Sequence, residues 1–362
     1  MKNKQTRKWF LAALAMLPAL TAVTAGPPPR PAAGEAGDDA VPALIRVLDV
    51  GRPVSHNGLT IVPVYNRKIA DRTEYVTLED ALKMKWIEIA EVDGGRVPQV
   101  KISNLSKHIL YLLGGEILSG ARQDRILAQD VLLDPGTKNL LVPVFCVEQG
   151  RWTAVSPTFT SKSNLGTATL RAQAMAQAPA AQSRIWDEVQ AQNEKMAVAS
   201  GTSAYQAAFD KKENKEAIEA IERKIAEELR LSDETVGVVI GLGGRIVSTD
   251  IFANPYLFKR QWPKILKSSA LSALHEGKPG AMTQKAAADF LKGLAGKEYR
   301  RKAALDLGFE LAAGDATVQA GALVFKEAVI HFAAFPQEEG KGKVIDTAEQ
   351  RIPVIRDFIQ QR

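Results

Sequence analysis

The fold is decided by the stretch Val236-Gly237-Val238-Val239-Ile240-Gly241-Leu242-Gly243-Gly244-Arg245-Ile246-Val247-Ser248. Two runs rich in branched apolar residues flank a glycine pair, a pattern typical of two antiparallel strands joined by a tight turn. A dinucleotide-binding fingerprint is excluded, because it needs a third glycine where Ile246 stands and a helix after the turn. The stretch therefore predicts a hairpin within an antiparallel sheet.

Further strands and several helices are expected on both sides of this hairpin. Runs of branched and aromatic residues separated by turn signals extend from 44–48 to 140–147, and a last group lies within 308–335. Helices are expected at 78–85, 255–274 and 283–294. The pattern predicts an α+β fold, with a mostly antiparallel strand core and helices packed on it.

Residues 161–231 form a block of different composition. Ten of the 33 residues from Ala168 to Ser200 are alanine, which favours helix. Apolar residues then recur at helical spacing at Ile218, Ile221 and Ile225. We expect a helical insertion that covers a face of the sheet, and these helices offer a surface for a protein partner.

The first 25 residues have the parts of a secretory signal peptide. A basic start precedes the apolar run Trp9–Val23, and Val23-Thr24-Ala25 places small residues at the cleavage site. We therefore expect cleavage near Ala25 and an extracytoplasmic location, periplasmic or secreted. The export route, general secretory or twin-arginine, stays open because Arg7-Lys8 only approaches a twin-arginine pair.

Cleavage would leave three further segments: a Pro/Gly/Ala spacer (26–40), a single α+β domain (41–335) and a polar tail (336–362). Removing the four basic residues of the leader leaves 43 basic and 41 acidic side chains. This near balance argues against a nucleic-acid-binding protein. No run after the leader is long and apolar enough to predict a membrane span.

Cysteine and histidine give no local catalytic or metal-binding motif. The chain has one cysteine, Cys146, within an apolar strand-like run, which predicts a buried and inert thiol. Its four histidines are far apart, and no pair has metal-ligand spacing. We therefore expect no metal site built from cysteine and histidine, although a site assembled in space from distant residues stays open.

Two polar segments follow predicted strands and contain the candidate ligand-binding residues. The first is Gly114–Arg125 and the second is Cys146–Trp152. Arginines offer bidentate donors to an anion, carboxylates orient them, and tryptophan stacks on a ring. The candidates are Glu116, Arg122, Gln123, Asp124, Arg125, Glu148, Arg151 and Trp152. An internal salt-bridge network joining the two segments is the competing interpretation.

The same segments resemble a known family. Gly114–Arg125 and Pro143–Trp152, with the later run Gly244–Phe252, are similar to the ARG and Rhodanese-Phosphatase-superfamily-associated protein domain family. The family name records association with ADP-ribosylglycohydrolase and phosphatase-like proteins. The resemblance implies a link to ADP-ribose or phosphorylated metabolites and supplies no established catalytic residues.

Three functions follow from these observations. The first is an exported module that binds an anionic ligand similar to ADP-ribose or a sugar phosphate. The second is a hydrolase in which Glu116, Asp124 or Glu148 is the general base, with or without a hard cation on clustered carboxylates. The third is a structural or partner-binding envelope protein. A pocket that joins the two polar segments would favour the first two.

Overall fold

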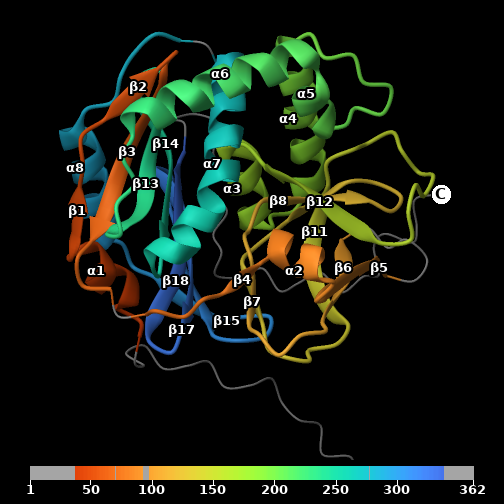
Figure 1. The fold of residues 1–362 in the computed structure, drawn as a ribbon, viewed down its shortest axis with the longest axis horizontal. Coiled ribbons are helices and arrows are strands. Elements are labelled where there is room, and N and C mark those ends of the chain that lie inside the picture. The colour runs from red at the N-terminus through yellow and green to blue at the C-terminus, as the bar shows by residue number, and fades with distance from the viewer. Residues whose placement is uncertain (1–36, 70, 93–97, 277, 338–362) are drawn as a thin grey trace, which may run out of the picture. The chain divides into compact units, whose positions relative to one another are not determined.

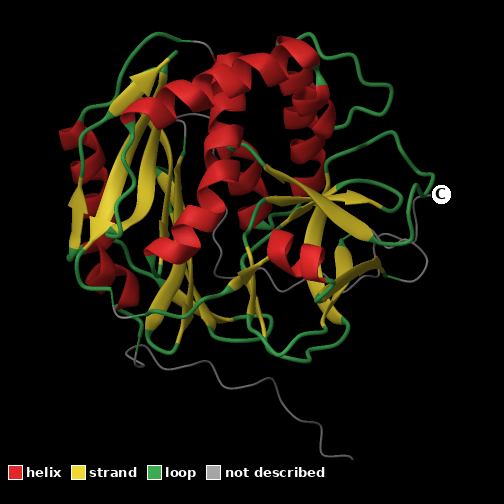
Figure 2. Cartoon of the chain, viewed as in Figure 1, coloured by secondary structure: helices red, strands yellow, loops and turns green. Residues whose placement is uncertain are grey.

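A computed structural model of the chain describes residues 37–69, 71–92, 98–276 and 278–337, which belong to one compact unit. The predicted leader (1–25), most of the spacer and nearly all of the tail lie outside the described residues. The described part contains eight helices and three sheets that are mostly antiparallel (Figure 1). The predicted α+β class is therefore confirmed, as Figure 2 also shows.

The predicted hairpin is formed by β13 (Thr235–Leu242) and β14 (Arg245–Phe252). Gly243 and Gly244 make its two-residue turn with φ values of 57° and 83°. Positive φ at both turn positions matches the right-handed twist of the strands, and glycine adopts it without strain. The hairpin is confirmed, and it lies in the middle of the largest sheet.

The largest sheet has nine strands, all paired antiparallel. Its order is β1-β3-β13-β14-β18-β17-β16-β15, with β2 paired to β3. The remaining strands are β1 (Leu48–Val50), β2 (Val54–His56), β3 (Leu59–Asn66), β15 (Arg300–Ala303), β16 (Phe309–Gly314), β17 (Val318–Phe325) and β18 (Ala328–Pro336). Sequential hairpins therefore build the C-terminal half of this sheet.

Two smaller sheets use the strands between β3 and the helical block. The six-stranded sheet has the order β12-β8-β9-β11-β6-β5, and the three-stranded sheet has the order β10-β7-β4. The first contains β5 (Ile87–Glu91), β6 (Gln99–Asn104), β8 (Glu116–Gly120), β9 (Arg125–Leu127), β11 (Leu140–Cys146) and β12 (Phe159–Leu165). The second contains β4 (Val76–Thr77), β7 (Leu110–Leu112) and β10 (Val131–Leu133).

The helices cover both faces of the large sheet. They are α1 (Ala40–Ile45), α2 (Leu78–Met84), α3 (Ala168–Ala176), α4 (Ala181–Lys195), α5 (Gln206–Asp210), α6 (Lys212–Glu228), α7 (Pro255–Glu276) and α8 (Gln284–Ala295). Figure 1 shows α1 and α8 on one side of the sheet and α7 on the other. Each side has its own cluster of buried apolar side chains, so the sheet is buried on both faces.

One predicted strand is wrong. Residues 44–48 were expected to be extended, but α1 continues to Ile45 and β1 begins only at Leu48. Val41 and Ile45, four positions apart, are both buried on one face of α1. A short apolar run fits a helix as well as a strand, and packing against α8 decides it here.

The helical block differs from its prediction at its start. Residues 161–165 belong to β12, which pairs with β8 and has a register shift between Ser161 and Leu165. The helices α3 to α6 then occupy 168–228. In α6 the side chains of Ile218, Ile221 and Ile225 are buried in the core. Their apolar stripe is therefore used internally.

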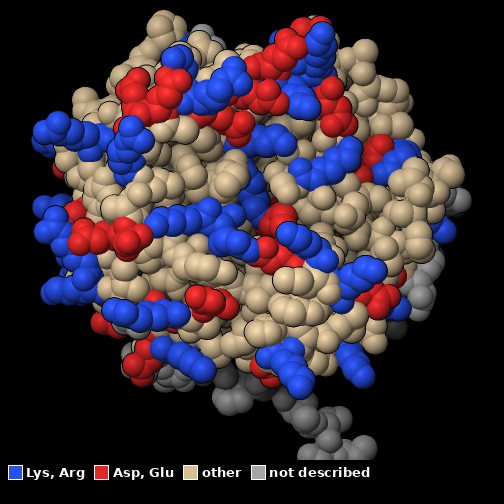
Figure 3. Space-filling view, viewed as in Figure 1, with Lys and Arg blue, Asp and Glu red and all other residues tan. Residues whose placement is uncertain are grey.

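The charged side chains are mixed on the face of the molecule that Figure 3 shows. Lysine and arginine alternate with aspartate and glutamate over this face, without a broad area of one sign. None of the helices in the described part of the chain combines the length and apolar character that a bilayer crossing requires.

Candidate functional site

The two predicted polar segments meet through Arg151. Its Nη2 lies 2.9 Å from Asp124 Oδ1 and 2.6 Å from Glu148 Oε2. Its Nη1 donates to the Ala121 carbonyl oxygen at 2.7 Å. The Glu148 carboxylate also accepts from the Asp124 backbone amide and, at 2.8 Å, from the Thr202 hydroxyl. Arg151 thus ties the β8–β9 turn to the segment after β11, with its charge fully paired.

Arg125 lies beside this group and is only 3% exposed. Its Nη1 donates to Gln123 Oε1 at 3.0 Å and to Cys146 Sγ at 2.7 Å. Burial raises the pKa of the Cys146 thiol to about 11, although the Arg125 charge opposes the shift. The prediction of a buried Cys146 is confirmed, and the thiol is protonated at neutral pH.

The other three candidates lie apart from Arg151. Arg122 is half exposed and faces Glu91, with Nε 3.6 Å from Oε2. The Trp152 side chain is 59% exposed. Glu116 is fully buried and pairs with Lys264 of α7. The structure therefore gathers Gln123, Asp124, Arg125, Glu148 and Arg151, places Arg122 at their edge, and separates Trp152 and Glu116 from them.

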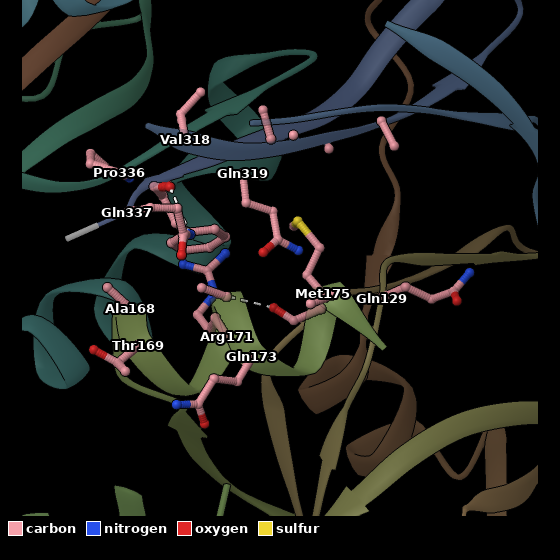
Figure 4. A pocket seen from close by; sticks show the side chains of 18 of the residues that line it. Gln129, Ala168, Thr169, Arg171, Gln173, Met175, Val318, Gln319, Pro336 and Gln337 are labelled. Atoms are coloured by element: carbon pink, nitrogen blue, oxygen red, sulfur yellow. Dashed lines mark hydrogen bonds between the residues drawn. The ribbon is translucent and has the colours of Figure 1, made fainter. Parts of the chain in front are cut away.

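A large cleft lies elsewhere in the fold, and none of the eight predicted residues lines it. Its volume is about 2110 Å³, and α3, the strands β15 to β17 and residues 128–130 form its walls. Figure 4 shows Met175 of α3 and Gln319 of β17 pointing toward each other across it. Small residues line both walls, with Ala172 and Ala176 on α3 and Gly321 on β17, where Met175 of α3 packs against Gly321.

A chain of buried charges ends in this cleft. Arg171 of α3 forms a bidentate pair with Asp250 of β14, with nitrogen–oxygen distances of 3.0 and 2.5 Å. Asp250 Oδ1 lies 3.1 Å from His331 Nε2, and His331 Nδ1 lies 2.7 Å from Asp130 Oδ2. The Gly114 amide donates to the other oxygen of Asp130 at 2.7 Å. Arg171, His331 and Asp130 all line the cleft, and both oxygens of Asp130 are held.

The environment of His331 favours the imidazolium form. Burial alone would lower the pKa of His331, but Asp130 and Asp250 outweigh it and raise the pKa above its ordinary value. The ring stacks on Phe252, with centroids 4.3 Å apart. Burial would raise the pKa of Asp250, but Arg171 and His331 hold it well below its usual range. The positive charges of Arg171 and His331 therefore balance the negative charges of the two aspartates they contact.

A second carboxyl group, Glu310 of β16, lines the same cleft. Burial, and to a smaller extent the charge of Asp130, raise the pKa of Glu310 to about 7, and Lys302 opposes the shift. Gln129 Nε2 donates to Glu310 Oε1, and Gln177 Nε2 donates to Gln129 Oε1 at 2.8 Å. One carboxyl group that holds a proton near neutral pH therefore lies near a second one that a histidine positions. Such a pair suits acid–base chemistry.

Sequence reasoning missed this site because its members are far apart in the chain. Arg171 and Asp250 are 79 residues apart, and Asp130 and His331 are 201 residues apart. One signal was present: Asp250 is the single charged residue of β14 after Arg245, next to the apolar Ile251-Phe252. A charge in a strand expected to be buried needs a partner. The spacing of residues along the sequence does not indicate which residue is that partner.

The described residues contain no group of three or more His, Cys, Asp or Glu side chains that could hold a metal ion. A family model described as "ARG and Rhodanese-Phosphatase-superfamily-associated Protein domain" matches residues 47–335. No curated protein matches the chain, and no solved structure does so. The matched span contains the whole of the buried charge chain and Glu310.

Proposed function

The chain belongs to the ARG and Rhodanese-Phosphatase-superfamily-associated Protein domain family, and we propose that it is an exported hydrolase with an anionic, sugar-phosphate-like substrate. The observation that carries the proposal is the carboxyl pair in the cleft. Glu310, with a pKa of about 7, lies near Asp130, which His331 holds. The two side chains have environments that suit an acid and a base respectively.

In this proposal Glu310 donates a proton to the leaving group and Asp130 activates a water molecule. Hydrolysis of a bond between a sugar and its substituent needs these two roles, and two carboxyl groups commonly supply them. The raised pKa keeps a proton on Glu310 near neutral pH, where an ordinary glutamic acid is ionised. His331 and the Gly114 amide direct the Asp130 carboxylate.

The lining of the cleft supports an anionic substrate. Arg184, Arg300 and Lys302 are among its basic side chains, and Lys302 acts on Glu310. A phosphate bound by Arg300 and Lys302 of β15 would lie on the same wall as the proposed acid, since Lys302 is opposite Glu310 in the β15–β16 pair. The volume of about 2110 Å³ has room for a ligand of nucleotide-sugar size. The family resemblance to ADP-ribose-associated proteins points to the same ligand class.

Substrate screening tests the proposal. The chain without residues 1–25 should be stabilised thermally by ADP-ribose or a ribose phosphate and should release product detectable by chromatography. Glu310→Gln and Asp130→Asn should each lower turnover by about 100-fold or more, while the ligand-induced thermal shift remains. Glu298→Gln changes another acidic residue of the cleft lining and serves as the control. Unchanged turnover in both Glu310→Gln and Asp130→Asn would refute the assignment of these residues as the acid and the base.

A partner-binding role is the second candidate, and one observation favours it. The loop after β11 exposes Trp152 and Val155, which are 59% and 67% exposed. Arg151 and the hydrogen bond from the Val155 amide to the Ala121 carbonyl hold this loop in place. A fixed loop with exposed apolar side chains resembles an interface anchor. Loss of a co-purifying partner in Trp152→Ala, with turnover unchanged, would support this role.

A further inference from the structure

Helix α3 is linked indirectly to both carboxyl groups of the cleft through chains of hydrogen-bonded side chains. Arg171 reaches Asp250, and from there His331 and Asp130 follow in hydrogen-bonding distance. Gln177, the residue that ends α3, reaches Gln129. The two anchors lie six positions apart, so one short helix is linked to the proposed base and to the proposed acid.

The link to Glu310 is a directed chain of two amides. Gln177 Nε2 donates to Gln129 Oε1 at 2.8 Å, so Gln129 presents its Nε2 to Glu310 Oε1. Each amide has one donor end and one acceptor end, and the orientation of the first therefore sets the orientation of the second. Gln177 is the C-cap of α3 and has a left-handed backbone, with φ of 45°.

We propose that Gln177 and Gln129 are positioning residues that fix the orientation of the Glu310 carboxyl group, so that α3 aligns both members of the pair. The use of this alignment in catalysis rests on the proposed function. Because Gln129 donates to Oε1, the proton of Glu310 belongs on Oε2, the oxygen left to face a substrate. Reversal of the amide chain would turn an acceptor toward Glu310, and only protonated Glu310 could then donate to it.

A test that needs no substrate is the pH profile of carbodiimide labelling, since carbodiimides react with protonated carboxyl groups. Labelling with a water-soluble carbodiimide and glycinamide is followed at Glu310 by peptide mass spectrometry from pH 5 to 9. Gln177→Glu can only accept from Gln129 and reverses its amide, whereas Gln177→Lys can only donate and preserves it. Gln173, also on α3 and in the cleft lining, receives the same two changes as controls for long-range charge.

The charged groups that act on Glu310 are Asp130 and Lys302, and none of the four variants changes either. We expect wild-type labelling to fall with a midpoint near pH 7. Gln177→Glu should move the midpoint up by about 0.5–1 pH unit, which corresponds to one hydrogen bond. Gln177→Lys and the Gln173 variants should move it by less than half of that.

The outcomes separate this inference from the proposed function. Equal shifts in Gln177→Glu and Gln173→Glu, or no shift in Gln177→Glu, would overturn the positioning role while leaving the acid in place. If Glu310 of the wild type is not labelled at pH 6.5, it holds no proton near neutral pH. That result would contradict both the proposed acid and the positioning role. A shift confined to Gln177→Glu, with Glu310 labelled at neutral pH in the wild type, supports the positioning role.

Discussion

Single arginines in this protein differ in how much their charges contribute to the stability of the fold. Arg151 is 16% exposed and pairs with two carboxylates, whereas Arg122 is 47% exposed and reaches one carboxylate at 3.6 Å. Removal of a largely buried partner leaves charges unpaired, but a solvated ion pair contributes little. The two arginines, from neighbouring loops, therefore make a matched comparison.

We expect Arg151→Ala to lower the free energy of unfolding by about 3 kcal/mol, because Asp124 and Glu148 lose their shared cation. Arg122→Ala should change it by less than about 1 kcal/mol. Urea unfolding followed by circular dichroism measures both. Similar small effects in the two variants would show that the Arg151 network does not stabilise the fold. The prediction that these residues bind a ligand would then be favoured again.

His331 predicts a pH dependence with a definite sign. Its pKa is higher in the folded protein than in the unfolded chain, where it is about 6.5. The folded state therefore keeps a proton that the unfolded state has lost, and stability falls as pH rises above about 6.5 through the folded pKa. The contribution is fully present below about pH 6.5.

In His331→Asn the slope above pH 7 should disappear, and the His56→Asn variant, which changes a partly buried histidine of β2, should keep it. The free energy of unfolding measured at intervals from pH 6 to 9 gives the comparison. Glu310 adds a slope of the same sign, but it ends near pH 7, where its folded pKa lies. A wild-type stability that rises between pH 7 and 9 would contradict the charged state assigned to His331.

At the scale of elements, the close approach of the two strands in the β13–β14 hairpin positions Asp250. Gly237 of β13 lies opposite Ile251, and a Cβ at Gly237 would be 2.2 Å from the Asp250 carbonyl oxygen and 2.8 Å from Ile251 Cα. The absence of a side chain there lets β14 approach closely. The approach fixes the backbone of the residue whose carboxylate holds Arg171 and His331.

Gly237→Ala should therefore lower the free energy of unfolding by about 3 kcal/mol, since backbone must move to admit the methyl group. Gly293→Ala is the control, because nothing lies within 4 Å of its Cβ position in α8. That change should raise stability by about 0.5–1 kcal/mol through helix propensity. Thermal unfolding of the two variants measures the difference, and a neutral Gly237→Ala would contradict the close packing of β14.

The sequence predicted elements whose signals are local. The central hairpin follows from two branched runs and a glycine pair, and α7 and α8 follow from helical spacing. The run 44–48 was too short to distinguish helix from strand, and contact with α8 decided it. The candidate site had no local signal, because strand pairing and α3 packing bring Arg171, Asp250 and His331 together from distant segments.

At the scale of the whole molecule, the helical block and the large sheet meet at the cleft. The α3 wall comes from the block, and the β15–β17 wall comes from the C-terminal strands. Arg171 therefore joins the two parts of the fold at the same place where it serves the proposed base. A rigid connection at this point would keep the acid and the base at a fixed distance and orientation, as acid–base catalysis requires.

The charge of the whole molecule gives the last prediction. The full sequence has a formal charge of +6 and an isoelectric point near 9.2, but loss of residues 1–25 would leave 43 basic and 41 acidic side chains. Protein recovered from the extracytoplasmic fraction should begin at Gly26 by N-terminal sequencing and should focus below pH 9.2. Ala25→Arg places a large charged residue at the cleavage site, so it should keep the leader and the higher isoelectric point. Wild-type protein found only in the cytoplasm with Met1 intact would contradict export, and the proposed substrate would then be sought inside the cell.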